Sequence, residues 1–215
     1  MEFHEKTRIK AIGNLLQYYE SDLVYIRNFR RFREGRIEGP SYLSTRPGTF
    51  RSFLNEYRVA RNRKRGETES LLSTILDWVK SPRADDVDGL AKMIRNVTFE
   101  KTMTSLASKI LFLNNPSVIV PCDSLNRAAL GLKLNEYGIF RSRMEAVRDK
   151  HLSEIAAWLA PVEEYLTLVE SGFHNEIESL GAIRVNRFVD KLLWVKGLEI
   201  KLKEDTKISE ERSLR

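Results

Sequence analysis

Apolar residues recur along most of this chain at spacings of three and four, which is the period of an amphipathic helix. The clearest stripes lie in residues 12–29, 71–79, 103–113 and 185–193. The apolar run at residues 118–120 is too short to found a sheet. The pattern therefore predicts a compact all-α domain of about nine or ten helices.

Glycine, proline and charge mark the divisions of the chain. Residues 35–48 are expected to form a loop, and a helix should restart at Phe50, run into a basic stretch and stop at Gly66. The last strong helix is expected to close at Gly197. We expect one domain over residues 1–198 and a highly charged, frayed tail over residues 199–215. The domain divides into a basic N-terminal part (27–65), a central core (67–135) and C-terminal packing helices (140–197).

The positive charge of the chain is concentrated in the basic N-terminal part. The whole chain carries a net charge of +6, whereas residues 27–65 carry +9 and the remainder carries −3. Eleven of the twelve basic residues in this part are arginines, whose planar guanidinium suits phosphate. This distribution favours a nucleic-acid partner over a merely solvated basic face.

Several classes of protein are not expected from the sequence. The N-terminus has no apolar core typical of a secretory signal, and no apolar stretch is long enough to span a membrane, so we expect a cytoplasmic protein, nucleoid-associated if bacterial. With one cysteine, Cys122, and three scattered histidines, we expect no disulfide, metal, iron–sulfur cluster or other cofactor. Phosphate-binding glycine loops, nucleophile elbows and zinc-protease motifs are absent.

Residues 104–132 contain the most informative segment. It reads Val120-Pro121-Cys122-Asp123-Ser124-Leu125-Asn126-Arg127 and continues to Leu130-Gly131-Leu132. This segment resembles the stretch around the catalytic aspartate of the helix-hairpin-helix DNA glycosylases. The resemblance implies the all-helical fold of that family, with residues 67–135 as its core. It also implies an enzyme that flips a damaged or modified base out of DNA and hydrolyses its N-glycosidic bond, in base-excision repair or in defence against modified foreign DNA.

Asp123 is the candidate catalytic residue that the resemblance gives. Cleavage of an N-glycosidic bond builds positive charge on the sugar, which a fixed carboxylate can stabilise, or the carboxylate can activate water. The plain alternative is that Asp123 only caps the helix that follows it, and the two roles can coexist. A cavity beside positive surface at Asp123 would favour the catalytic role.

The family's strand-cleaving members form a Schiff base through a lysine 18–19 residues before the aspartate. Thr104 and Ser105 occupy those positions here, which resembles the members that leave the strand intact. Lys101 and Lys109 bracket the position, so Lys109 is kept as a second candidate catalytic residue. The family's Gly-rich hairpin, which binds a DNA phosphate, corresponds to residues 96–105, where no glycine occurs. Either the hairpin is rebuilt or another device grips the backbone.

Two hypotheses follow for a protein that we expect to be a monomer and to bind DNA. The first is the DNA glycosylase, and the second is a non-enzymatic helical nucleic-acid-binding protein. Ser108 and Asn126 are candidates for the base pocket. The candidate DNA-binding residues are Arg58, Arg61, Arg63, Lys64, Arg65, Lys101, Thr104, Ser105 and Arg127.

Overall fold

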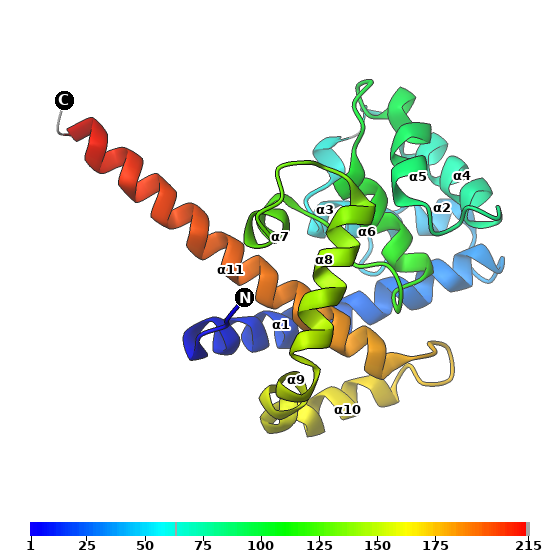
Figure 1. Cartoon of the computed structure of the whole chain (residues 1–215). Coiled ribbons are helices and arrows are strands. Elements are labelled where there is room, and N and C mark those ends of the chain that lie inside the picture. Colours follow the sequence, from blue (N-terminus) through cyan, green and yellow to red (C-terminus); the bar gives the residue numbers. More distant parts are fainter. Residues whose placement is uncertain (63, 214–215) are drawn as a thin grey trace.

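The computed structural model describes residues 1–62 and 64–213, and these residues form helices without any strand, which confirms the all-α prediction (Figure 1). The α-helices are α1 (Glu5–Arg33), α2 (Gly39–Tyr42), α3 (Phe50–Glu56), α4 (Thr68–Val79), α5 (Val87–Met93), α6 (Thr104–Asn114), α7 (Ser124–Ala129), α8 (Tyr137–Lys150), α9 (Leu152–Leu159), α10 (Glu163–Ser171) and α11 (Leu180–Ser213). Three short 3-10 turns, η1 (Ala60–Asn62), η2 (Ile94–Val97) and η3 (Ala160–Val162), join them.

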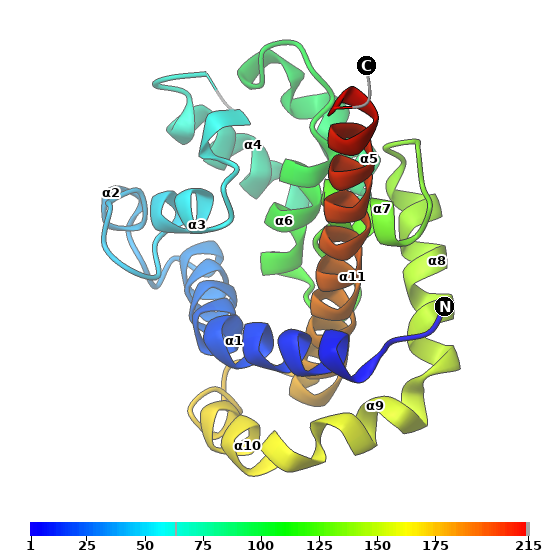
Figure 2. The ribbon, with the colours of Figure 1, turned by 90° about the vertical axis from the view of Figure 1, so that its left-hand side faces the viewer.

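The long helices α1 and α11 cross and pack against each other (Figure 2). Helix α11 also packs against α7 and α8, and α1 packs against α6. The central helix α6 packs against both α1 and α5, and its residues from Ile110 to Leu113 are fully buried. The large core side chains Phe29 of α1, Phe112 of α6 and Phe188 of α11 are also fully buried. Burial of this apolar surface is the main stabilising term of the fold, and it fixes the helices that surround the site.

The helix that begins at Phe50 ends earlier than the sequence predicted. Thr49 and Ser52 form a capping box at its start, and α3 closes at Glu56. Arg58 then adopts a left-handed conformation with φ of 55°, and the amide of Val59 donates to the carbonyl of Leu54. This conformation cannot continue a helix, so residues 58–62 and 64–66 form irregular structure with only the short turn η1.

The prediction that the last helix closes at Gly197 is wrong. Helix α11 passes through Gly197 and continues to Ser213, so the expected tail is helical as far as that residue (Figure 1). Gly197 is instead a point of close contact, because a Cβ added there would lie 1.9 Å from the carbonyl oxygen of Leu125 on α7. Only glycine lets α11 approach the backbone of α7 this closely.

Candidate functional site

A cavity of about 480 Å³ lies among α1, α6, α7, α11 and the segment that follows α3. It brings together residues that are distant in the sequence and that the sequence pattern singled out. Six of the candidate residues line it: Arg58, Arg61, Ser105, Lys109, Asp123 and Arg127. The volume falls within the range of about 300–1,000 Å³ typical of small-ligand sites.

Asp123 lies in this cavity and also caps α7, as the sequence predicted. Its Oδ1 accepts hydrogen bonds from the amides of Leu125 (2.9 Å) and Asn126 (3.0 Å). Within residues 1–62 and 64–213, no group donates a hydrogen bond to its second oxygen, Oδ2. The cap therefore uses one carboxylate oxygen, and the same side chain remains available to the cavity.

Lys109 lines the same cavity from α6. Its Nζ donates to the carbonyl oxygen of Tyr57 (3.1 Å) and lies 5.9 Å from the centre of the Tyr57 ring. Burial lowers the pKa of Lys109, and the negative charges of Asp123 and Asp190 act in the opposite direction. The cavity therefore holds both the carboxylate of Asp123 and the amine of Lys109, and this amine loses its proton more easily than that of an exposed lysine.

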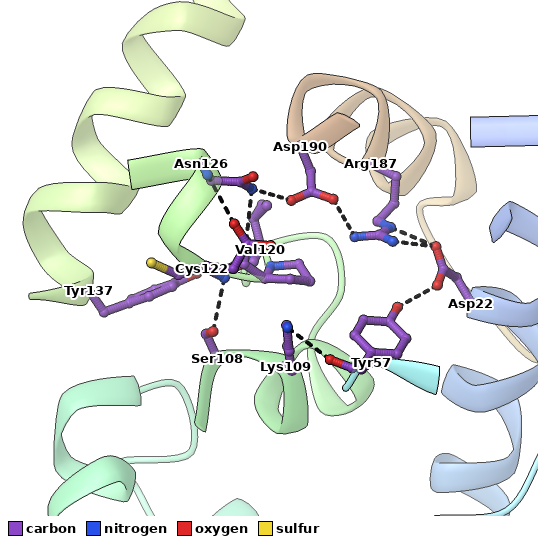
Figure 3. A network of polar contacts seen from close by, with 12 residues as sticks. Asp22, Tyr57, Ser108, Lys109, Val120, Cys122, Asn126, Tyr137, Arg187 and Asp190 are labelled. Carbon is purple, nitrogen blue, oxygen red and sulfur yellow. Dashed lines mark hydrogen bonds and ion pairs between the residues drawn. The ribbon is translucent and has the colours of Figure 1, made fainter. Parts of the chain in front are cut away.

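The loop between α6 and α7 is fixed by buried hydrogen bonds, which set the position of Asp123 (Figure 3). The hydroxyl of Ser108 accepts from the amide of Cys122 (3.0 Å). The hydroxyl of Tyr137 contacts the backbone of Val120, accepting from its amide (2.9 Å) and donating to its carbonyl (3.1 Å). Burial raises the pKa of Cys122 to about 12, so its thiol stays protonated and acts as a small packed group.

The two residues predicted for the base pocket have structural roles instead. Ser108 and Asn126 are both fully buried, and neither is among the residues that line the cavity. Ser108 is engaged with Cys122 as described, and Asn126 donates to Asp190 Oδ1 and contacts the carbonyl of Pro121. Both side chains support the loop that bears Asp123, so this prediction is wrong.

A buried charged cluster forms one side of the cavity (Figure 3). Arg187 donates to Asp22 and to Asp190, each at 2.7 Å, and the hydroxyl of Tyr57 donates to Asp22. Although burial lowers the pKa of Arg187, the carboxylates of Asp22 and Asp190 raise it above the ordinary value. Through the bond from Asn126 to Asp190, this cluster links α1 and α11 to α7.

The basic N-terminal part divides into two groups with different roles. Residues before the α2 region are tied into the fold: Arg31 makes a bidentate ion pair with Glu176, and Arg33 donates to Asn114 (2.7 Å). Arg58 and Arg61 are exposed and line the cavity, and Arg65 is exposed beyond them. Arg46, between α2 and α3, and Arg51, within α3, are also exposed, so the positive charge available to a polyanion lies in and around α3 and not along the whole of residues 27–65.

The other predicted DNA-binding residues lie in different environments. Lys64 forms an ion pair with Glu100 (3.5 Å), and Lys101 is exposed in the loop before α6. Thr104 is fully buried and donates to the carbonyl of Asn135 (3.1 Å), so it cannot contact DNA in this structure and that prediction is wrong. The predicted DNA-binding residue Arg63 lies outside the described residues.

The segment that corresponds to the glycine-rich hairpin includes a loop over residues 98–103, which precedes the first turn of α6. Phe99 and Glu100 both have positive φ, of 57° and 58°, a conformation that glycine usually supplies. Side chains hold the loop in place: the guanidinium of Arg95 donates to the carbonyl of Glu100 at 2.9 Å. Just before this loop, the carbonyl of Val97 accepts from the amide of Lys64 (2.8 Å). This bond connects the end of η2 to the basic residues that follow α3.

Sequence reasoning missed the wall of the cavity that α1 and α11 provide. Tyr18, Arg187, Asp190, Lys191 and Trp194 line it. The available signal was a set of charged residues at spacings of three and four within the otherwise apolar stripe of residues 183–195. Charged residues on the buried face of a helix require partners or a function, and here they have both a cluster and a cavity.

Comparison of this chain with family models, with curated proteins and with solved structures finds no match. Among the described helices, none combines the length and the apolar composition needed to cross a membrane. Within the same residues, no three His, Cys, Asp or Glu side chains lie in an arrangement that could hold a metal ion.

Proposed function

We propose that this protein is a DNA glycosylase that uses Asp123 to cleave the N-glycosidic bond of a nucleotide flipped into the cavity. The observation that carries the proposal is that Asp123 and Lys109 line one cavity whose other lining residues include four arginines, Arg58, Arg61, Arg127 and the ion-paired Arg187. A flipped base needs an enclosed pocket, and the displaced backbone needs cations near its mouth. The cavity is a partly open pocket, and the exposed arginines Arg58 and Arg61 line it.

The chemistry follows from the position of the carboxylate. As the bond between the base and C1′ breaks, the departing base takes the electron pair and the sugar becomes cationic. A fixed carboxylate near C1′ stabilises this charge, more strongly in a partly buried site than in water. Asp123 is held for this role by the two amide hydrogen bonds of the α7 cap and by the buried bond of Cys122 behind it.

The direct test is incubation of the protein with duplexes that carry normal, damaged and hypermodified bases, followed by alkaline treatment to reveal abasic sites. We expect release of at least one base and retention of the others. The second candidate function is a non-enzymatic nucleic-acid-binding protein, which the exposed arginines after α3 also favour. Tight DNA binding without release of any base from this panel would select the second function.

The exposed arginines after α3 should determine the salt dependence of DNA binding. Replacement of Arg58, Arg61 and Arg65 by glutamine is expected to weaken binding and to reduce the slope of log affinity against log salt by about 0.9 for each phosphate that is no longer neutralised. The matched control neutralises three cations on or near α8, Lys133, Arg143 and Lys150, which are also exposed. An equal effect of both triple variants would mean that binding depends on net charge and not on this surface.

We also propose Lys109 as a nucleophile toward C1′. The count back from Asp123 leads to Thr104 and Ser105 and to intact strands, but Thr104 is buried away from the cavity, whereas Ser105 and Lys109 both line it and only Lys109 carries an amine. Attack of the neutral amine at C1′ displaces the base, and ring opening of the sugar gives a Schiff base that borohydride reduces to a stable adduct. We expect borohydride to trap wild-type protein on DNA but not the Lys109→Arg variant, with Lys101→Arg as the control that still forms the adduct. A trapped adduct that survives Lys109→Arg would contradict this assignment.

A further inference from the structure

Lys191 is a lysine in the cavity wall that neither the resemblance nor the proposed chemistry uses. It lies on α11 beside Asp190 and lines the cavity together with Tyr18 from α1 and Trp194 one turn along α11. Its Nζ lies 4.9 Å from the centre of the Tyr18 ring. Burial and the positive charge of Arg187 lower the pKa of Lys191, which agrees with its partly enclosed position.

The ammonium of Lys191 contacts an aromatic ring but has no hydrogen-bond acceptor among the residues that the structure describes. Within residues 1–62 and 64–213, no oxygen or nitrogen atom accepts a hydrogen bond from its ammonium, and it forms no ion pair. The neighbouring carboxylates are already engaged, because Asp22 accepts from Arg187 and Tyr57, and Asp190 accepts from Arg187 and Asn126. The ammonium of the half-buried Lys191 has up to three donors, and a ligand in the cavity can supply their acceptors in place of water.

The surroundings of Lys191 suit the flat face of a nucleobase. Tyr18, Tyr57 and Trp194 bring three aromatic rings to the same cavity. Aromatic rings stack on any base and therefore do not discriminate among bases by themselves. Discrimination requires polar groups, and the ammonium of Lys191 is a donor on this wall that has no acceptor among the described residues.

We propose that Lys191 is the specificity-determining residue of this cavity, and that it selects a flipped base that presents an exocyclic carbonyl oxygen to its ammonium, at the position where the related amino base carries an amino group. A keto base such as uracil or hypoxanthine satisfies the ammonium. The corresponding amino base, cytosine or adenine, has an amino group at this position, so the N–H donors of the base face the N–H donors of Lys191. This inference rests on the proposed function for the base as ligand, and it adds the class of base that is accepted.

The test uses pairs of duplexes that differ only in the keto or amino group of one base: uracil against cytosine, and hypoxanthine against adenine. Each target nucleotide carries a 2′-fluoro group in the arabino configuration, which slows bond cleavage so that affinity can be measured alone. We expect the wild-type protein to bind the keto member of each pair about tenfold more tightly or better, which is the scale expected of one unsatisfied donor. Lys191→Met should reduce this ratio to near one, whereas Lys203→Met, at an exposed position farther along α11, should leave it unchanged.

A second variant separates a specific loss of base preference from a loss of folding. Lys191→Gln keeps a polar side chain that can both donate and accept, so it should retain the thermal unfolding transition of the wild type and bind keto and amino bases alike. Equal affinity of the wild type for both members of each pair would overturn the assignment, as would a keto preference that survives both Lys191 variants.

Base release from the same duplexes without the fluoro group separates this inference from the proposed function. A keto preference in affinity that depends on Lys191, without any release of base, would keep the inference for a binding site and reject the glycosylase. Release of base with no keto preference would keep the glycosylase and reject the role of Lys191. Neither preference nor release would reject both.

Discussion

Asp123→Asn is expected to lower the rate of base release by about 10²–10³, which is typical of the loss of one well-placed electrostatic group. The asparagine carbonyl oxygen can still accept hydrogen bonds from the amides of Leu125 and Asn126, so the cap of α7 is retained. The negative charge that stabilises the cationic sugar is lost. DNA affinity should stay the same or rise, because a negative charge near the phosphates has been removed.

The chain supplies a matched control for this substitution. Asp86 also caps a helix, α5, with its Oδ1 accepting from the amide of Gly89 (2.7 Å); its Oδ2 forms an exposed ion pair with Arg83, and it is not among the residues that line the cavity. Asp86→Asn should leave base release unchanged. Three measurements on each variant are needed: thermal stability, DNA affinity and the rate of base release. Base release at the wild-type rate from a folded Asp123→Asn protein would reject the catalytic assignment and leave Asp123 as a cap only.

The sequence predicted those features of the site that depend on local chemistry. The capping role of Asp123 was readable because a short carboxylate before an Ala- and Leu-containing run meets the free amides of the next turn. The helical class was readable because apolar periodicity persists over long segments. Both signals lie within a few residues of the structure that they predict.

The parts that could not be predicted depend on contacts between distant residues. Asp22 and Arg187 are 165 positions apart, and Lys109 reaches the carbonyl of Tyr57 across 52 positions. Polar residues at the α6–α7 junction gave equally good candidates for a pocket, but packing sealed Ser108 and Asn126 inside and left Ser105 and Lys109 at the cavity. Which face of a helix is covered is decided by its partners, which local patterns do not specify.

The misjudged helix ends have a similar origin. The sequence around Arg58 is compatible with continued helix, yet the chain takes a left-handed turn there without a glycine. A non-glycine residue in this conformation carries an unfavourable energy of about 1 kcal/mol or more, which the surrounding structure must offset. The turn sets exposed Arg58 at the cavity, beside the carbonyl of Tyr57 that binds Lys109. The strain therefore lies where the proposed function needs a cation.

Arg187→Met is expected to give the largest loss of stability, about 3–5 kcal/mol in the free energy of unfolding. Arg187 is 2% exposed and is the shared cation of Asp22 and Asp190, whose side chains are also buried. Methionine fills a similar space but leaves two buried carboxylates without their counter-charge. The loss should be measured by chemical denaturation.

The matched control removes an arginine from an exposed ion pair of ordinary geometry. Arg141 and Glu145 form an ion pair at 2.9 Å on α8, and their side chains are 39% and 35% exposed. Arg141→Met should therefore cost no more than about 1 kcal/mol. The triple variant Asp22→Asn, Asp190→Asn, Arg187→Met removes the stranded charges, while each asparagine can still accept from Tyr57 or Asn126. It should be more stable than Arg187→Met alone, because the cost arises from uncompensated charge; a triple variant that is less stable would show instead that packing around the guanidinium accounts for the loss.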